Sequence, residues 1–434
     1  MTQTMEILTD QTVKVADLVV IGLGYVGLPL VQAACRSHMS VVGFDINQGV
    51  TSGLNAGRSH IDDLSDDHVA ELLSCGFFAT SNEAYLKNSR VITICVPTPL
   101  SNDGRPDLTA VIAATRSVAR NLSSGTTVIL QSTTYPGTTD EIVKPILEQE
   151  SGLTAGVDFH LAFSPERIDP GNTAFRMHNT PKVVGGLTST CTASAVNFFS
   201  QFVDTVVPAK GPREAETAKL LENSYRYVNI ALVNEMAQFC RDLDIDIWDV
   251  VSLASTKPYG FQAFYPGPGV GGHCIPIDPL YLSSHVRDKL GRPFQSIELA
   301  HQINSAMPAY IVQRVQDILN TDGKALRGST ILLLGVTYKP NISDLRESPA
   351  RPLAEALLAK GADIMFHDPG IKAWTMNDNS EIHCVEDLHH AVRCADLVIL
   401  MQNHKEYDAD TLAEQSIRFL DSRGVTTTTQ AQRL

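Results

Sequence analysis

The chain has 434 residues, of which 43% are hydrophobic and 19% charged, and its formal net charge is −14. This length predicts two or three domains, and the composition is typical of a soluble globular protein rather than a disordered one. The acidic balance argues against nucleic acid or an anionic membrane as a partner, although local Arg and Lys residues still allow an anionic small molecule. Residues 1–14 lack a secretory pattern, no apolar run is long enough for a membrane span, and the cysteines show no paired spacing, so we expect a cytoplasmic location.

The N-terminal part of the chain alternates strand-like and helical patterns. Strand-like runs cover residues 17–21, 41–44, 91–96, 127–130 and 160–163, with helical segments between them. Alternation of this kind predicts a parallel sheet with helices on both faces.

A glycine cluster separates the first strand from the first helix. Gly22 allows a tight turn, Gly24 lets a pyrophosphate approach the backbone, and Gly27 permits close packing of the helix. Asp45 ends the next strand, where a carboxylate accepts hydrogen bonds from ribose hydroxyls and repels a 2′-phosphate. The pattern therefore predicts binding of NAD rather than NADP. The alternative for Asp45 is a turn residue at a strand end.

Three further loops follow the carboxyl ends of predicted strands, where ligands bind in open parallel sheets. They cover residues 96–99 (VPTP), 132–137 (STTYPG) and 163–166 (FSPE). We expect the first two to touch the cofactor, and Glu166 is a candidate carboxylate for handling water or substrate. Thr98 is equally consistent with a turn hydroxyl, and a strand-end Glu taken alone is more often a solvated surface group.

A long stretch without Gly or Pro, residues 213–242, predicts a single helix. Its second half, 227–239, is apolar over most of its circumference, which is typical of a buried helix, here between domains and against a partner subunit. Lys219 and Asn223 are four residues apart and share one face, where a cation and an amide could hold an oxyanion. A solvated helical face is the alternative on spacing alone.

One cysteine stands at the end of a glycine-rich run, in residues 269–278 (GVGGHCIPID). Cys274 presented in this way can attack a bound carbonyl, and Asp278 follows it by one helical turn. The histidines and cysteines around positions 273 and 383–390 lack metal-ligand spacing, so no metal is predicted. Other free cysteines are usually small buried hydrophobes, as we expect for Cys35, Cys95 and Cys240.

A weak internal repeat begins near residue 329. The runs 329–335, 362–368 and 394–400 resemble the first strands but lack the G-x-G-x-x-G spacing, which predicts a second doubly wound domain that binds something other than a dinucleotide. Lys339 and Arg346 follow the first of these strands, where two cations would suit a diphosphate, although a solvated charged loop is comparably consistent. The polar tail, 425–434, is expected to be frayed.

Taken together, these motifs resemble the UDP-glucose/GDP-mannose dehydrogenase family over nearly the whole chain. The matching pieces, in order, are GLGYVGLP (22–29), VPTP (96–99), STTYPGTT (132–139), FSPER (163–167), AKLLENSYR (218–226), GVGGHCIPIDP (269–279), GVTYKPNISDLRES (335–348) and LDSR (420–423). The resemblance implies an α/β fold with two doubly wound, Rossmann-like domains joined by a long central helix. It also implies NAD as cofactor, a UDP-sugar as substrate and a homodimer.

The implied domains are an NAD-binding Rossmann domain (1–208), a central helical dimerisation and active-site domain (209–322) and a C-terminal UDP-sugar-binding domain (323–434). The implied reaction converts the C6 hydroxymethyl of the sugar to a carboxylate and reduces two NAD. Cys274 would form a thiohemiacetal and then a thioester. The implied supporting roles are oxyanion stabilisation by Lys219 and Asn223, support of Lys219 and water by Asp278, and positioning or activation of water by Glu166 and Thr133.

The resemblance also implies binding residues. Cofactor contacts are implied for Gly22, Gly24, Tyr25, Val26, Gly27, Asp45, Val96, Pro97, Thr98, Thr133 and Arg346. Substrate contacts are implied for Glu166, Arg167, Lys219, Asn223, Tyr265, Gly269, Gly271, Tyr338, Lys339 and Arg423.

Segments 164–172 and 265–279 look most like those of family members that oxidise UDP-N-acetylhexosamines. UDP-N-acetylglucosamine is the first expectation, and UDP-N-acetylmannosamine or UDP-glucose is the alternative. Two departures stand out: Val50 replaces a frequent Lys or Arg, and the second carboxylate of the UDP-glucose type falls at Pro170, with Asp169 one residue away. The rival classes are a single-oxidation hydroxyacid dehydrogenase and a non-catalytic protein that binds NAD and UDP.

Overall fold

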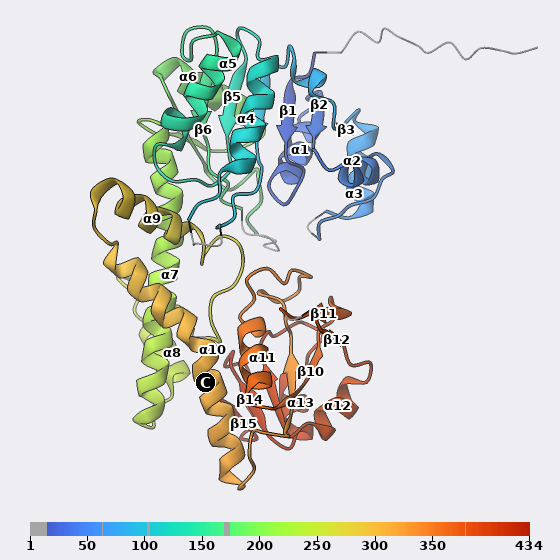
Figure 1. Ribbon diagram of the computed structural model, residues 1–434, viewed down its shortest axis with the longest axis vertical. Helices are drawn as coiled ribbons and strands as arrows, with labels where there is room; N and C mark the ends of the chain where they lie inside the picture. Colours follow the sequence, from blue (N-terminus) through green and yellow to red (C-terminus); the bar gives the residue numbers. More distant parts are fainter. Residues whose placement is uncertain (1–14, 63, 102–104, 169–173, 378) are drawn as a thin grey trace, which may run out of the picture. The chain divides into compact units, whose positions relative to one another are not determined.

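The chain forms two compact units, residues 1–219 and 220–434, in the computed structural model (Figure 1). The structure describes residues 15–62, 64–101, 105–168, 174–377 and 379–434. The expectations for residues 1–14, Asp169 and Pro170 therefore lie outside the described residues. Within the described ranges, no helix has both the length and the apolar character needed to cross a membrane.

The first unit contains an eight-stranded sheet, as far as its residues are described, in the order β3-β2-β1-β4-β5-β6-β7-β8. The strands are β1 (Leu18–Ile21), β2 (Val41–Phe44), β3 (Phe78–Thr80), β4 (Val91–Ile94), β5 (Thr127–Leu130), β6 (His160–Phe163), β7 (Lys182–Gly186) and β8 (Val206–Pro208). Neighbouring strands from β3 to β6 are parallel, which confirms the predicted α/β sheet. The later strand β7 runs antiparallel to β6.

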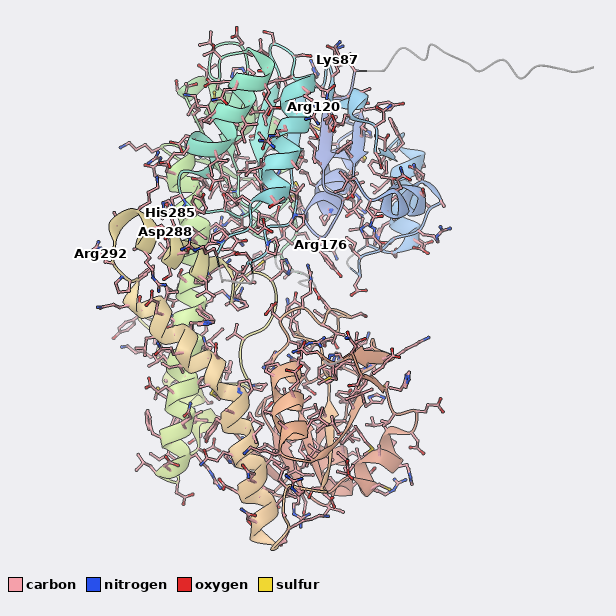
Figure 2. All side chains as sticks on the ribbon, in the orientation of Figure 1. Lys87, Arg120, Arg176, His285, Asp288 and Arg292 are labelled. Carbon is pink, nitrogen blue, oxygen red and sulfur yellow. The ribbon has the colours of Figure 1, made fainter. Side chains whose placement is uncertain are left out.

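Helices cover both faces of this sheet. They are α1 (Gly27–Arg36), α2 (Gln48–Asn55), α3 (Asp66–Ser74), η1 (Glu83–Leu86), α4 (Thr109–Asn121), η2 (Thr139–Val143), α5 (Lys144–Ser151) and α6 (Ser189–Phe199). Leu18 and Val20 of β1 belong to one hydrophobic core, while Val19 belongs to another, because successive strand residues point to opposite faces. Burial on both faces explains the continuous apolar runs of these strands. Charged groups such as Arg120 of α4 lie at the surface (Figure 2).

The second unit carries the predicted second doubly wound sheet. Its described part has the strand order β10-β9-β13-β14-β15, with all neighbours parallel. The strands are β9 (Thr330–Leu334), β10 (Asp363–His367), β13 (Leu397–Leu400), β14 (Phe419–Asp421) and β15 (Ala431–Arg433), with β11 (Ala373–Thr375) and β12 (Glu381–His383) as a separate antiparallel pair. The runs 329–335, 362–368 and 394–400 are thus confirmed as the strands β9, β10 and β13.

The C-terminal tail is ordered, so the expectation of a frayed segment 425–434 is wrong. Strand β15 pairs with β14, and Leu434 is buried in the core of the unit. The carboxylate of Asp421 accepts hydrogen bonds from the backbone N–H groups of Val425 and Thr426, at 2.7 and 2.8 Å. Backbone pairing and this carboxylate hold a tail whose polar composition gave no sign of a strand.

The long helix predicted over 213–242 is confirmed as α7 (Pro212–Asp242). The remaining helices of the second unit are α8 (Ile247–Ser255), α9 (Asp278–Leu290), α10 (Gln295–Thr321), α11 (Ala350–Ala359), α12 (Leu388–Cys394) and α13 (Ala409–Gln415). Ala237 and Cys240 of α7 share one hydrophobic core with Trp248 of α8 and Met307 of α10. A large, fully buried side chain such as Met307 stabilises the fold by about 1.5–3 kcal/mol. Figure 2 marks His285 and Asp288 on α9.

Candidate active site

The glycine turn after β1 has the geometry of a pyrophosphate-binding turn. Gly22 has a φ of 90°, and a Cβ added there would lie 2.7 Å from the carbonyl oxygen of Cys95. A Cβ at Gly27 would lie 1.9 Å from the carbonyl oxygen of Gly22. At Gly24, by contrast, a Cβ would meet no described atom within 4 Å, so this side of the turn is open. The turn therefore has no room for a side chain at Gly22 or Gly27, where the backbone is closely packed, but it leaves space for a ligand at Gly24.

Asp45 is fixed beside this turn at the end of β2. Its Oδ2 accepts the N–H of Leu23 at 3.0 Å, and its Oδ1 accepts the N–H of Asn47 at 2.9 Å. Helix α1 has Tyr25 and Val26 at its start, and Val26 provides no side-chain cap for the first N–H groups. Those N–H groups and the helix dipole suit a phosphate, and the Asp45 carboxylate suits a ribose. The residues present therefore fit a dinucleotide.

The two loops expected to touch the cofactor are held together. The Ser132 hydroxyl donates to the carbonyl oxygen of Val96 at 2.7 Å. Pro97 and Thr98 follow Val96, and Thr133 follows Ser132 as a half-buried side chain. The structure thus brings the VPTP and STTYPG loops to one edge of the sheet, as expected for neighbouring parallel strands.

Glu216 anchors the second of these loops and was missed in the sequence. This fully buried carboxylate accepts the N–H of Gly137 at 2.7 Å, and the N–H and hydroxyl of Thr139 at 2.9 and 2.7 Å. Burial raises the pKa of Glu216 to about 7, against its ordinary 4.5. Glu216 lies three residues before Lys219 on α7. Its hydrogen-bond partners are more than 70 residues away in the sequence, so no local pattern indicated its role.

Glu166 is placed after β6 and is held by a buried lysine. Its Oε2 lies 2.8 Å from Nζ of Lys182, and its Oε1 accepts the N–H groups of Arg167 and Ile168 at 2.7 and 2.8 Å. Burial alone raises the pKa of this carboxyl, but Lys182 and the two N–H donors outweigh burial and hold the pKa below its usual range. The Arg167 guanidinium donates to the carbonyl oxygen of Pro181 at 2.6 Å. Lys182 is the second functional candidate missed in the sequence.

Lys219 and Asn223 are both buried, so the alternative of a solvated helical face is excluded. Nδ2 of Asn223 donates to Oδ2 of Asp278, the first residue of α9, at 2.6 Å. The N–H of Asp278 in turn donates to the carbonyl oxygen of Cys274 at 2.8 Å. The second unit therefore joins Asn223, Asp278 and the Cys274 backbone in one hydrogen-bonded chain. Lys219 ends the first unit, one helical turn before Asn223.

Cys274 is partly exposed, whereas Cys35, Cys95 and Cys240 are buried as expected. Its glycine-rich loop packs against the segment after β9. A Cβ at Gly271 would lie 2.7 Å from Cβ of Tyr338, and the N–H of Gly272 donates to the carbonyl oxygen of Arg346 at 3.2 Å. Gly269, with a φ of 136°, adopts a backbone conformation that side chains disfavour. Gly271 therefore permits the close approach to Tyr338, while Gly269 permits the backbone conformation of the loop.

Tyr265 and Arg423 lie near the other end of this loop. Tyr265 stacks on Trp248 with ring centroids 6.1 Å apart, and its side chain remains exposed. A Cβ at Gly267 would lie 2.9 Å from a terminal nitrogen of Arg423, and Nε of Arg423 donates to the carbonyl oxygen of Met401. Burial lowers the pKa of Arg423 to about 10. A cation removed from water in this way favours an anionic ligand.

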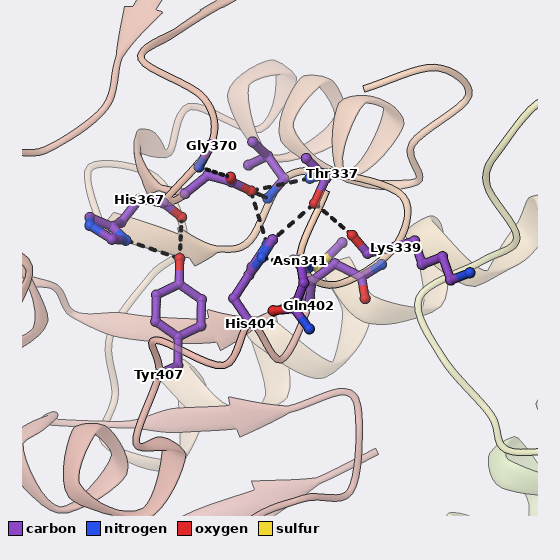
Figure 3. Close-up of polar contacts among 12 residues, drawn as sticks. Thr337, Lys339, Asn341, His367, Gly370, Gln402, His404 and Tyr407 are labelled. Atoms are coloured by element: carbon purple, nitrogen blue, oxygen red, sulfur yellow. Dashed lines mark hydrogen bonds and ion pairs between the residues drawn. The ribbon is translucent and has the colours of Figure 1, made fainter. Parts of the chain in front are cut away.

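A buried polar cluster behind β9 holds the segment that carries Tyr338 and Lys339 (Figure 3). Nδ1 of His404 accepts the N–H of Asn341 at 3.0 Å, so its other nitrogen, Nε2, carries the proton. Nε2 lies 3.2 Å from Oδ2 of Asp368, which also accepts the N–H of Val336 at 2.8 Å. Nε2 of Gln402 donates to the carbonyl oxygen of Tyr338 at 2.8 Å. The backbone around Lys339 is therefore fixed by groups that face away from solvent.

Arg346 makes a bidentate pair with Asp344. Its Nε donates to both carboxylate oxygens at 3.0 Å, and its second nitrogen donates to Oδ2 at 2.6 Å. Burial raises the pKa of Asp344, but Arg346 outweighs it and the net pKa is low. The contact with cofactor expected for Arg346 stays a prediction.

Fold and site together define a class of protein: a dehydrogenase with a dinucleotide-binding Rossmann domain, a cysteine loop and a second Rossmann-like domain. Residues 16–203 match the NAD binding domain of the UDP-glucose/GDP-mannose dehydrogenase family, residues 213–306 its central domain, and residues 332–428 its UDP binding domain. The chain belongs to this family and is an NAD-dependent nucleotide-sugar dehydrogenase.

Several named proteins are similar to the chain over nearly its full length. UDP-N-acetyl-D-mannosamine dehydrogenase of Escherichia coli K12 is 32% identical over 427 residues, covering 94% of this chain and 99% of that protein. The structure of UDP-D-ManNAc dehydrogenase from Pyrococcus horikoshii superimposes with a TM-score of 0.87 at 31% identity, covering 96% of this chain and 98% of that chain. NDP-N-acetyl-D-galactosaminuronic acid dehydrogenase from Methanosarcina mazei Go1 gives a TM-score of 0.81 at 28% identity, with 96% and 95% covered.

Proposed function

We propose that this enzyme oxidises the C6 hydroxymethyl of a UDP-N-acetylhexosamine to a carboxylate in two NAD-dependent steps. The observation that carries the proposal is the Cys274 loop, which packs on Tyr338 and is tied through Asp278 to Asn223. Two of the three relatives named above are UDP-N-acetylmannosamine dehydrogenases, which favours this substrate, the second expectation from the sequence, over UDP-N-acetylglucosamine, the first. We therefore rank UDP-N-acetylmannosamine as the leading substrate.

The chemistry follows from the thiol and the donors around it. The Gly22–Gly27 turn and Asp45 would hold NAD, and two NAD bound in succession would supply the hydride acceptors for the two oxidations. After the alcohol becomes an aldehyde, the sulfur of Cys274 bonds to C6 and the thiol proton passes to the carbonyl oxygen, which forms a thiohemiacetal. Loss of a hydride and a proton gives a thioester, and water displaces the sulfur, which releases the uronic acid and restores the thiol. Lys219 and Asn223 donate hydrogen bonds to the C6 oxygen, while Glu166 and Thr133 position water.

The substrate would lie against the second Rossmann-like domain. We assign its diphosphate and sugar to Tyr265, Lys339 and Arg423, with Gly269 and Gly271 giving backbone access. The low pKa of Arg423 and the rigid backing of Lys339 by His404 support this assignment. We also propose that the chain consists of three domains, with boundaries after residues 208 and 322.

We also propose a homodimer built on α7. Its side chains Leu221, Tyr225, Leu232 and Phe239 are 66%, 47%, 53% and 45% exposed in the single chain. At about 100° per residue these four positions fall within roughly 40° of one another around the helix. An exposed apolar stripe of this length is typical of a surface that a second copy of the chain covers.

A substrate panel tests the function. NADH is followed by absorbance with UDP-hexoses and UDP-N-acetylhexosamines, and the sugar product is identified by mass spectrometry. We expect two NADH for each uronic acid, with UDP-N-acetylmannosamine the best substrate. One NADH with free aldehyde would favour a single-oxidation dehydrogenase, and no NADH with any UDP-sugar would refute the proposed substrate class. Cys274→Ser should abolish acid formation, while Cys75→Ser, at an exposed cysteine, should not.

A further inference from the structure

Lys182 is a buried cation without a role in the chemistry described above. Its side chain is 3% exposed, and that of Glu166 is 11% exposed. Burial of an ammonium group is unfavourable unless partners compensate it, so the position of this lysine requires an explanation.

Three groups surround the ammonium of Lys182. Oε2 of Glu166 lies at 2.8 Å, Oε1 of Gln131 at 3.5 Å, and the ring centroid of Phe199 at 5.2 Å. The nearby thiol of Cys95 is neutral, because burial raises its pKa to about 12. Of these two titratable groups, Glu166 and Cys95, only Glu166 carries a charge.

The Glu166 carboxylate is held from two sides. Oε1 accepts hydrogen bonds from the N–H groups of Arg167 and Ile168, and Oε2 is paired with Lys182. A ligand could reach the carboxylate only through the 11% of the Glu166 side chain that is exposed. Strand β7, which begins at Lys182, runs antiparallel to β6, which ends just before Glu166. The reversed strand therefore delivers the lysine to the same edge of the sheet as the carboxylate.

We propose that Lys182 is a positioning residue that acts through Glu166, fixing the orientation of the carboxylate and keeping it ionised while water attacks the Cys274 thioester. This inference rests on the proposed function. An ionised carboxylate held in one orientation accepts a hydrogen bond from water. A protonated carboxyl group would instead donate a hydrogen bond to the water and change the orientation of the water. The low pKa of Glu166 is consistent with this role.

The test measures hydrolysis of the acyl-enzyme by itself. UDP-sugar and NAD are mixed with the enzyme, quenched at intervals, and the Cys274 thioester is quantified by mass spectrometry over a range of pH. Because the thiol is acylated in this step, its own titration does not contribute. Wild-type decay should not depend on pH near neutrality.

Lys182→Met should slow the decay and introduce a pH dependence whose midpoint lies roughly 1–3 units above that of the wild type, since a nearby cation lowers a carboxyl pKa by about that amount. Lys182→Arg should restore the wild-type profile. Unchanged decay in a folded Lys182→Met protein that still forms the acyl-enzyme would overturn the proposal. Failure of the wild type to form any acyl-enzyme would instead refute the proposed function.

A double variant separates positioning from folding. In a Glu166→Gln background, Lys182→Met should cause no further loss, because the lysine would act only through the missing carboxylate. The double variant also removes both buried charges, which favours folding even if Lys182→Met alone unfolds. A further, additive loss in the double variant would overturn the proposal.

Discussion

At the scale of single residues, Lys219 is the cation that we propose as a hydrogen-bond donor to the C6 oxygen of the substrate. It is buried on α7, one helical turn before Asn223. Loss of one donor to a developing oxyanion reduces the rate by about 10²–10³-fold, so we expect Lys219→Ala to lower kcat by that factor. Steady-state kinetics with the best UDP-sugar measures the change. Lys210→Ala, at an exposed lysine of the same unit, is the matched control, and a comparable loss there would argue against the assignment.

Glu216 makes the stability of the first unit depend on pH. Its pKa is about 7 in the folded chain and 4.5 ordinarily, so between these values the folded state binds more protons than the unfolded state. Its contribution to stability is therefore full below pH 4.5 and is lost as pH rises through 7. The total change corresponds to about 3 kcal/mol in the free energy of unfolding.

Glu216→Gln should remove this pH dependence, because the amide does not titrate. Denaturant unfolding at several pH values between about 4.5 and 8 measures it. Glu214→Gln, at an exposed position on the same helix, should keep the wild-type slope. An equal slope in Glu216→Gln and wild type would contradict the prediction.

At the scale of elements, the backbone of the segment between β9 and α11 is held in place by hydrogen bonds from residues that follow β13. Gln402 and His404 follow β13 and bind the backbone at Tyr338 and Asn341 (Figure 3). Segments fixed by buried polar groups lose their geometry when one partner is removed, because the other is left unsatisfied at a cost of about 1–3 kcal/mol.

His404→Ala should therefore weaken UDP binding, since Lys339 lies between the two anchored positions, and should leave NAD binding unchanged. Isothermal titration calorimetry with UDP and with NAD separates the two effects. His383→Ala changes an exposed histidine of the same unit and serves as the control. Equal UDP affinity in His404→Ala and wild type would show that the cluster does not control the substrate site.

At the scale of the whole molecule, the apolar stripe of α7 predicts the assembly. Leu232 lies near its middle and is 53% exposed, so a charge there would be buried against the second copy. We expect Leu232→Glu to shift the protein from dimer to monomer in light scattering coupled to size-exclusion chromatography. Leu358→Glu, on α11, should leave the dimer intact. A wild-type protein that is monomeric at high concentration would exclude the proposed interface.

Features that depend on neighbours in the sequence were predictable. The five N-terminal strands, the glycine turn before Gly27, the long helix α7 and the strands β9, β10 and β13 of the second sheet appear where the patterns indicate. Hydrophobic periodicity and turn chemistry operate over a few residues to a few turns, so the sequence displays them directly. Strand β14 was not predicted, and neither was the order of the tail at 425–434, which comes from pairing with β14 and from Asp421.

The amino-acid sequence by itself determined which residue types stand at each strand end and which family the chain resembles. The tertiary structure alone decided their partners: Lys182 for Glu166, 16 residues away, Asp278 for Asn223, 55 residues away, and Glu216 for the loop at Gly137, 79 residues away. Charge pairing and hydrogen bonding depend on distance through space and on exclusion of water, and neither is written in the order of residues until the sheet and helices have packed.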